Sequence, residues 1–169
     1  MSSTLIISLF VFLPIIIFIV VIAVQQKKKA RRKKSELLTV YKRIVLTDKL
    51  EITDEQIMYN KIFAADRHRK VFVFVHNREE PAYDIIHLNG LSACKVERTG
   101  LELTTTSDGK PKKELHVNEL SISFLLGASV LASVKIYSEI YDGLQEYLHL
   151  KGITEQWQQK LDNIIGTRP

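Results

Sequence analysis

The chain opens with a long apolar stretch. From Leu5 to Val24, twenty residues follow one another without a charged side chain. At 1.5 Å per residue, such a stretch forms a helix about 30 Å long, which matches the hydrocarbon core of a bilayer. A cleaved signal peptide is disfavoured because Met1–Thr4 holds no cation and no A-x-A triplet follows the apolar residues. The pattern predicts a retained transmembrane anchor over residues 1–26.

A dense cationic run follows directly. Cationic flanks stay on the cytoplasmic side of a membrane and attract anionic lipid. We therefore expect a single-pass protein of the plasma membrane, with the N-terminus outside and the C-terminal domain in the cytoplasm. The expected membrane-surface anchor consists of seven side chains: Lys27, Lys28, Lys29, Arg31, Arg32, Lys33 and Lys34.

Helical periodicity appears next, in Ser35–Thr47. One face of this segment is apolar and the other is polar, which is typical of an amphipathic helix. The apolar stripe faces either the folded domain or the membrane surface, and the first is the commoner arrangement. Residues 27–48 are thus predicted to be a basic juxtamembrane block and a linker helix, with the stripe Leu37, Leu38, Tyr41, Ile44 and Val45.

Residues 49–169 show mainly strand patterns. Val71–Val75 is apolar on both faces and predicts a central strand. Asp108-Gly109 predicts a tight hairpin turn, and a second connection is expected near Gly127-Ala128. Two segments stay open: Tyr83–Leu88 is either a strand or a helical turn, and Leu144–Leu150 is either a strand or a helix. The expected strands are Lys49–Thr53, Lys61–Ala65, Lys70–His76, Leu91–Arg98, Leu101–Thr106, Lys113–Phe124 and a last strand reaching Ile140.

The chain ends on a predicted helix. Gly152 is expected to end the preceding element, and Thr154 is a suitable N-cap. Gly166 supplies the stop. The apolar face of this helix consists of Trp157, Leu161, Ile164 and Ile165.

The charge is unevenly distributed. The chain holds 24 Lys and Arg against 19 Asp and Glu, but the seven cations of residues 27–34 leave 17 against 19 from Ser35 onward. A nucleic-acid-binding domain spreads positive charge over its folded face, so this class is not expected here. The single cysteine, Cys94, cannot form an intrachain disulfide and is predicted to be a buried apolar residue.

The sequence holds no pattern typical of an enzyme. It lacks a glycine-rich phosphate loop, a G-x-S-x-G elbow and an H-E-x-x-H pair, and its five histidines are scattered. The acidic pairs Asp54-Glu55 and Glu79-Glu80 lie in polar stretches where solvated turn charges explain them. We therefore predict no catalytic residues, no metal and no cofactor.

The element order resembles a pleckstrin-homology-like (PH-like) domain: six or seven short antiparallel strands followed by a helix that carries Trp157. The turn Asp66–Arg69 and the segment Tyr83–Ile86 are also similar to those of small bacterial single-pass membrane proteins with such domains. The resemblance covers about Leu50 to Arg168. It implies an α+β fold, in which an antiparallel β-sandwich or barrel is capped by the C-terminal helix.

The same family offers a candidate lipid site. Many phosphoinositide-binding members carry a lysine, a spacer and two nearby basic residues across the first hairpin, a spacing that Lys61, Arg67 and Arg69 fit, with Lys70 adding charge. These cations could hold a phosphorylated headgroup or anionic lipid. The alternative interpretation is an ordinary solvated hairpin tip.

The sequence therefore predicts a membrane-anchored cytoplasmic binding or scaffold domain. Its expected partners are the lipid bilayer and a protein that the sequence does not identify, and the oligomeric state is left open. The alternative function is an anionic-lipid sensor that uses the basic hairpin turn.

Overall fold

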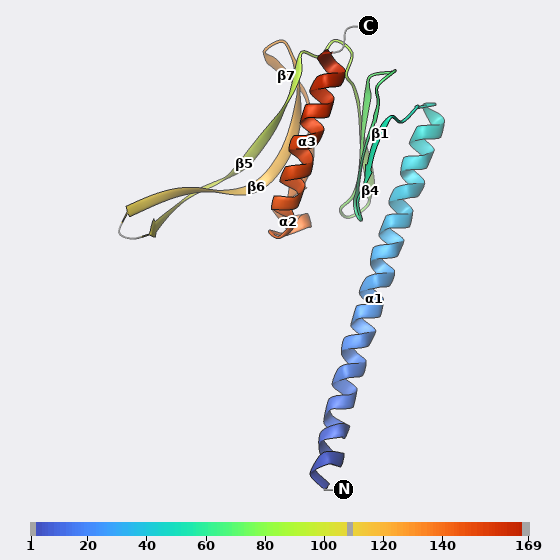
Figure 1. The fold of residues 1–169 in the computed structure, drawn as a ribbon, viewed down its shortest axis with the longest axis vertical. Coiled ribbons are helices and arrows are strands. Elements are labelled where there is room, and N and C mark those ends of the chain that lie inside the picture. The colour runs from blue at the N-terminus through green and yellow to red at the C-terminus, as the bar shows by residue number, and fades with distance from the viewer. Residues whose placement is uncertain (1–2, 108–109, 167–169) are drawn as a thin grey trace.

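The computed structural model describes the backbone of residues 3–107 and 110–166, and the side chains of residues 17–102 and 116–166. It is a mixed α+β structure, as predicted, with helices at both ends of a β-rich region (Figure 1). The elements are α1 (Ser3–Thr47), β1 (Asp54–Ile57), β2 (Lys61–Asp66), β3 (Val71–Asn77), β4 (Pro81–His87), β5 (Ala93–Ser107), β6 (Lys110–Leu126), β7 (Ser129–Ser138), α2 (Glu139–Asp142) and α3 (Glu146–Gly166).

The strands form two antiparallel sheets in simple sequence order. The first sheet is β1-β2-β3-β4 and the second is β5-β6-β7. Each neighbouring pair is a hairpin, so consecutive strands need only short turns. The predicted central strand is confirmed, since β3 lies between β2 and β4 and its first five residues are buried.

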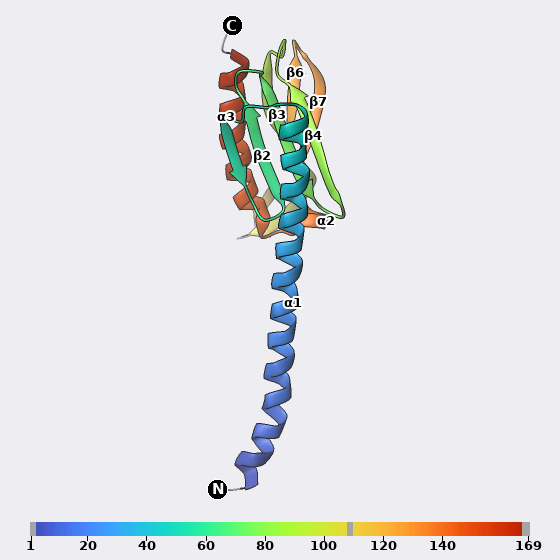
Figure 2. The same cartoon turned by 90° about the vertical axis from the view of Figure 1, so that its right-hand side faces the viewer.

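The first sheet is covered on both faces. α1 packs along its outer face, as Figure 2 shows with α1 in front of the sheet. Leu37, Tyr41 and Ile44 of α1 are buried there against Ile62 and Val73. The amphipathic stripe therefore faces the domain, as expected. The two-sided burial explains why β2 and β3 are apolar at nearly every position.

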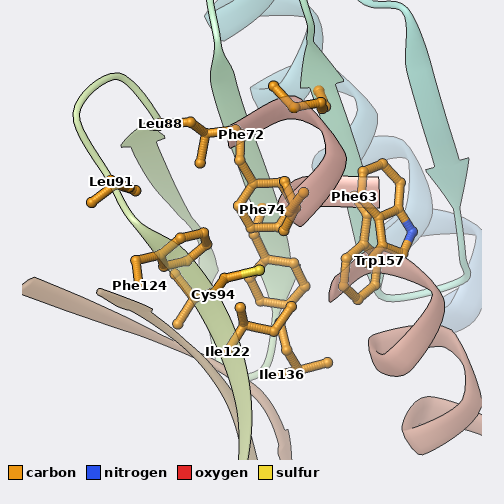
Figure 3. Packing of buried hydrophobic residues seen from close by; sticks show 14 of the residues in the cluster. Phe63, Phe72, Phe74, Leu88, Leu91, Cys94, Ile122, Phe124, Ile136 and Trp157 are labelled. Carbon is orange, nitrogen blue, oxygen red and sulfur yellow. The ribbon is translucent and has the colours of Figure 1, made fainter. Parts of the chain in front are cut away.

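The main core lies on the other face of this sheet. Trp157 of α3 is fully buried and stacks on Phe63, with ring centroids 5.6 Å apart (Figure 3). The second sheet closes the core with Ile122 and Phe124. Cys94 lies in the same cluster, so its predicted role as a buried apolar residue is confirmed. The helical face predicted around Trp157 is the core-facing one.

α1 is a single helix of 45 residues that runs through the cationic block without interruption. It extends well beyond the domain at its N-terminal end (Figure 1). Within the part of the chain that the structure describes, no helix is both long and apolar enough to cross a membrane. Residues 5–16 of the predicted span have side chains outside the described set. The predicted anchor is therefore not confirmed.

The barrel form of the predicted fold is wrong. The two sheets share one core, but among the described residues no strand of one sheet pairs with a strand of the other. α3 lies between the edge strands β1 and β5: Trp157 Nε1 donates to Gln56 Oε1 at 2.8 Å, and the Cys94 amide donates to Asp162 Oδ1, also at 2.8 Å. A helix in this position fills the space where the edges would otherwise meet.

β5 and β6 are much longer than predicted and project sideways from the body as a two-stranded arm (Figure 1). The predicted strands Leu91–Arg98 and Leu101–Thr106 are a single strand, β5, which has a bulge between Thr99 and Gly100. A Cβ on Gly100 would lie 2.0 Å from the His116 carbonyl oxygen, so only glycine fits there. The predicted Asp108-Gly109 turn lies outside the described residues.

Other local predictions need correction. Residues 49–53 form no strand: Lys49 has a left-handed φ of 50° just after α1, and β1 begins at Asp54. α3 begins at Glu146, so Thr154 is not its N-cap. Thr154 instead lies buried within the helix, where its hydroxyl donates to the Leu150 carbonyl at 2.6 Å. The open segment Tyr83–Leu88 is mostly strand β4, whereas Leu144–Leu150 is mostly helix.

Candidate functional site

The basic turn between β2 and β3 is held by internal contacts. Arg67 makes two hydrogen bonds to the Asp54 carboxylate, at 2.6 and 3.1 Å, and this guanidinium holds the pKa of Asp54 below its usual value. Arg69 donates to the Asp48 carbonyl at 2.5 Å. Both guanidinium groups thus tie the turn to β1 and to the end of α1. Lys70 has a left-handed φ of 53° and its own partner.

Lys61 does not belong to this turn. It starts β2, whereas Arg67 follows the other end of the strand, roughly 17–20 Å away at about 3.3 Å per residue. Its side chain is only 1% exposed and forms an ion pair with Asp142. The structure therefore brings Arg67 and Arg69 to one end of the domain and places Lys61 at the other.

Six of the seven cations of the predicted membrane-surface anchor are exposed along α1, and Lys33 is partly buried. Arg32 pairs with Glu36 at 2.8 Å within the helix. Lys33 Nζ donates to the Arg78 carbonyl at 3.4 Å, and Asn77 Nδ2 donates to the Lys33 carbonyl at 3.5 Å. The turn between β3 and β4 therefore contacts α1 inside the cationic block.

A polar cluster lies at this same end of the domain. Asp142, the last residue of α2, accepts hydrogen bonds from Lys61 and from the Ser138 amide, the latter at 3.0 Å. Arg78 donates to the Lys135 carbonyl at 2.7 Å, and its guanidinium lies over the Tyr141 ring, 5.8 Å from the centroid. We call Lys61, His76, Arg78, Lys135, Tyr141 and Asp142 the proximal cluster.

Burial sets the protonation of this cluster. Removal from water lowers the pKa of Lys61, and the ion pair with Asp142 opposes that shift. Burial, with the nearby charges of Arg78 and Lys61, lowers the pKa of His76 to about 4, so this imidazole is neutral at pH 7. Its Nδ1 is buried and has no hydrogen-bond partner among the described residues. The cluster thus combines one tightly held ion pair with a neutral histidine.

An open hollow of about 600 Å³ lies beside the cluster, lined by His76, Arg78, Glu79, Glu80, Lys135 and Tyr141. It brings cations and carboxylates together but no activated nucleophile. The Cys94 thiol lies elsewhere, and burial together with the Asp162 carboxylate raises its pKa, which keeps it protonated. Within the described part of the chain, no three His, Cys, Asp or Glu side chains gather as metal ligands would. The hollow suits binding of a polar group.

The strand edges opposite α3 form a second surface. In the described residues, β4 pairs only with β3 and β7 only with β6. An open groove runs between β4 and α1; its two hollows, of about 370 and 580 Å³, share Asp48 and Ile85. Tyr83 on β4 lines it and is 54% exposed. An unpaired strand edge beside a groove can accept an extended peptide.

Sequence reasoning missed the proximal cluster. Lys61 and Asp142 are 81 positions apart, and the dipeptide Asp142-Gly143 is typical of a turn, where aspartate is common for local reasons. The only usable signal was a lysine at the start of an otherwise apolar strand. Such a lysine needs a partner if it is buried, but the sequence does not tell which carboxylate supplies it.

Comparison of the chain with protein-family models, with curated proteins and with solved structures finds no match.

Proposed function

We propose that this protein is a membrane-anchored binding or scaffold protein whose cytoplasmic domain holds a protein partner close to the lipid surface. The observation that carries the proposal is the continuity of α1. One helix joins the uncharged stretch Leu5–Val24, the cationic block and the stripe that packs on the first sheet. No flexible linker separates these parts, so a bilayer around the first would hold the domain beside it.

Such tethering has a thermodynamic benefit for binding. A domain confined near a membrane meets other membrane-bound proteins at an effective concentration that reaches the millimolar range. A partner of modest intrinsic affinity would then be bound for most of the time. The groove between α1 and β4 is the proposed contact surface, because backbone groups on the outer edge of β4 can add a strand of the partner.

We also propose that the domain is PH-like. Four strands followed by three, with a closing helix whose tryptophan enters the core, support that assignment. The lipid-sensing alternative is less well supported. Arg67 and Arg69 already have partners, and Arg69 contacts Asp48. Asp48 lies fourteen residues beyond Lys34, about 21 Å farther from the cationic block along the helix.

Site-specific photo-crosslinking in cells tests the partner-binding surface. A photoreactive phenylalanine analogue replaces Tyr83 on β4, and the matched control replaces Tyr59, which is equally exposed at 55% but lies between β1 and β2. A discrete adduct at position 83 and none at position 59 is expected. Equal labelling at both positions, or none at position 83, would contradict the proposal.

Topology is tested separately. A reporter enzyme that works only outside the cytoplasm, fused after Pro169, should remain inactive in intact cells. Replacing the cations of residues 27–34 by neutral residues should loosen or invert this orientation. An active reporter on the unmodified chain, or recovery of the full-length protein in the aqueous fraction, would refute the anchor.

A further inference from the structure

Four large apolar side chains are exposed at the end of the domain that carries the proximal cluster. Ile140 is 88% exposed, Tyr141 48%, Leu144 59% and Leu148 75%. They come from α2, the turn after it and the first turn of α3, and α2 has no buried residue at all. We call these four residues the apolar foot. Exposed apolar side chains gathered in this way mark contact surfaces.

The foot is firmly attached to the domain. Asp142 is fixed by its ion pair with the buried Lys61 and by the Ser138 amide. The Gly143 amide donates to the Glu139 carbonyl at 3.0 Å, and Gly143 has a φ of 73°, which closes the turn into α3. Behind the foot, Leu150 is buried in a small cluster with Tyr137. The apolar residues are therefore presented outward by a well-packed support.

Two contacts place the foot relative to α1. Lys33 binds the carbonyl of Arg78, and the Arg78 guanidinium lies over the ring of Tyr141. The foot thus lies at about the level of Lys33 along α1, at the end of the domain toward which the uncharged helix extends (Figure 1). Lys33 is nine residues past Val24, or about 14 Å along the helix axis.

From this placement we propose that the apolar foot rests in the headgroup region of the same bilayer that holds α1, an inference that depends on the proposed membrane anchor. A headgroup layer is roughly 5–8 Å thick, so an upright α1 would leave a gap. The foot is offset sideways from α1 by two packed layers, roughly 20 Å. A tilt of about 20–25°, ordinary for single helices, lowers it by about 7–8 Å.

The chemistry of the foot suits this location. Tyrosine combined with aliphatic side chains is typical of membrane interfaces. Two of the neighbouring carboxylates are already paired, Glu139 with His116 at 3.0 Å and Asp142 with Lys61. The electrostatic attraction to anionic lipid comes from the cations of residues 27–34, and the foot adds apolar contact at a second point. Two points of contact fix the tilt of the domain.

Depth-dependent quenching tests the inference on the full chain. Single variants Leu148→Cys, Leu131→Cys and Val20→Cys, each with Cys94→Ala, carry an environment-sensitive fluorophore in vesicles of phosphatidylcholine with one quarter phosphatidylglycerol. Leu131 is a matched control, since it is 63% exposed but lies near the β6–β7 turn, at the opposite end of the domain. A spin label near the headgroup end of the acyl chains is the quencher.

We expect quenching at position 148 to exceed that at position 131 at least twofold, with strong quenching at position 20. Quenching at 20 but equal values at 148 and 131 would overturn the foot and leave the anchor intact. No quenching at 20 would refute the anchor and, with it, the foot, because the foot is proposed to rest in the bilayer that holds α1. Protection of position 148 from aqueous iodide without lipid quenching would indicate a protein interface and overturn the inference.

Discussion

Lys61 and Asp142 offer the sharpest test of how this domain is held together. Each side chain is 1% exposed, so neither charge is screened by water. Removing one member of such a pair leaves an uncompensated buried charge and typically costs about 3–5 kcal/mol. A domain of this size has about 5–15 kcal/mol of total stability, so either single variant loses a large share of it.

The perturbation is a double-mutant cycle with Lys61→Met and Asp142→Asn. Methionine matches the lysine stem in length, and asparagine keeps an oxygen for the Ser138 amide, whose bond to Asp142 is 3.0 Å. Each single variant should lose about 3–5 kcal/mol. The double variant removes both charges, so it should lose less than the sum, with a coupling energy of about 2 kcal/mol or more.

Urea unfolding followed by tryptophan emission provides the measurement. Trp157 is the only tryptophan and is fully buried, so its emission reports the folded core directly. The midpoint should fall while the slope stays constant, because the surface exposed on unfolding hardly changes. Single variants within 1 kcal/mol of the parent, or strictly additive losses, would refute the idea that burial makes this pair decisive.

Four further predictions concern other sites. The folded-state pKa of His76, about 4, lies below its ordinary 6.5, so the unfolded chain binds the extra proton first. Stability should therefore fall by about 1–3 kcal/mol as the pH drops from 6.5 to 4. In urea titrations at several pH values, His76→Gln should weaken the dependence of the unfolding free energy on pH. Asp54 and Asp84 contribute equally in both proteins, so an unchanged pH dependence would exclude His76 as its source. Gly100→Ala should lower stability by about 1–3 kcal/mol because its Cβ meets the His116 carbonyl. Gly152→Ala, in an open helical position, should raise stability by about 0.5–1 kcal/mol. A higher melting temperature for Gly100→Ala than for Gly152→Ala would contradict both glycine predictions. In flotation of residues 27–169 with anionic vesicles, Arg67→Ala with Arg69→Ala should change binding less than twofold, whereas neutralising the cations of residues 27–34 should abolish it; the reverse result would restore the lipid-sensing alternative.

Local patterns predicted much of the fold. Alternation and apolar runs located β2, β3 and the turn between β6 and β7, where Gly127 indeed takes a left-handed φ of 63°. The spacing of Trp157 and Leu161 identified the core face of α3. These predictions succeeded because burial on one or two faces of an element leaves a direct trace in neighbouring residues.

Two predicted breaks, each beside a glycine, do not occur. Gly152 suggested a break, but α3 continues through it because Leu150 and Ile153 bury the same face on either side. The predicted strands Leu91–Arg98 and Leu101–Thr106 form one strand, and Gly100 between them is required by the close approach of the β6 backbone. A glycine allows a break without imposing one, and tertiary packing decides which occurs.

The grouping of Lys61 with the basic turn differs from the structure for another reason. The spacing between Lys61 and Arg67 fits a hairpin tip only if both lie on the same end of the strand, and β2 separates them. Which carboxylate meets a buried lysine depends on how two sheets and α2 come together. That information is spread over the whole fold and leaves no local pattern.

Because α1 is unbroken, the number of residues in the helix sets the rotation of the domain about the helix axis. Each residue of an α-helix turns the chain by about 100°. One residue inserted near position 30 would rotate the β4 edge about the axis of α1 by about 100°, whereas seven inserted residues would nearly restore its original orientation. The direction in which the β4 edge faces therefore limits which neighbouring proteins can reach it, in addition to their chemistry.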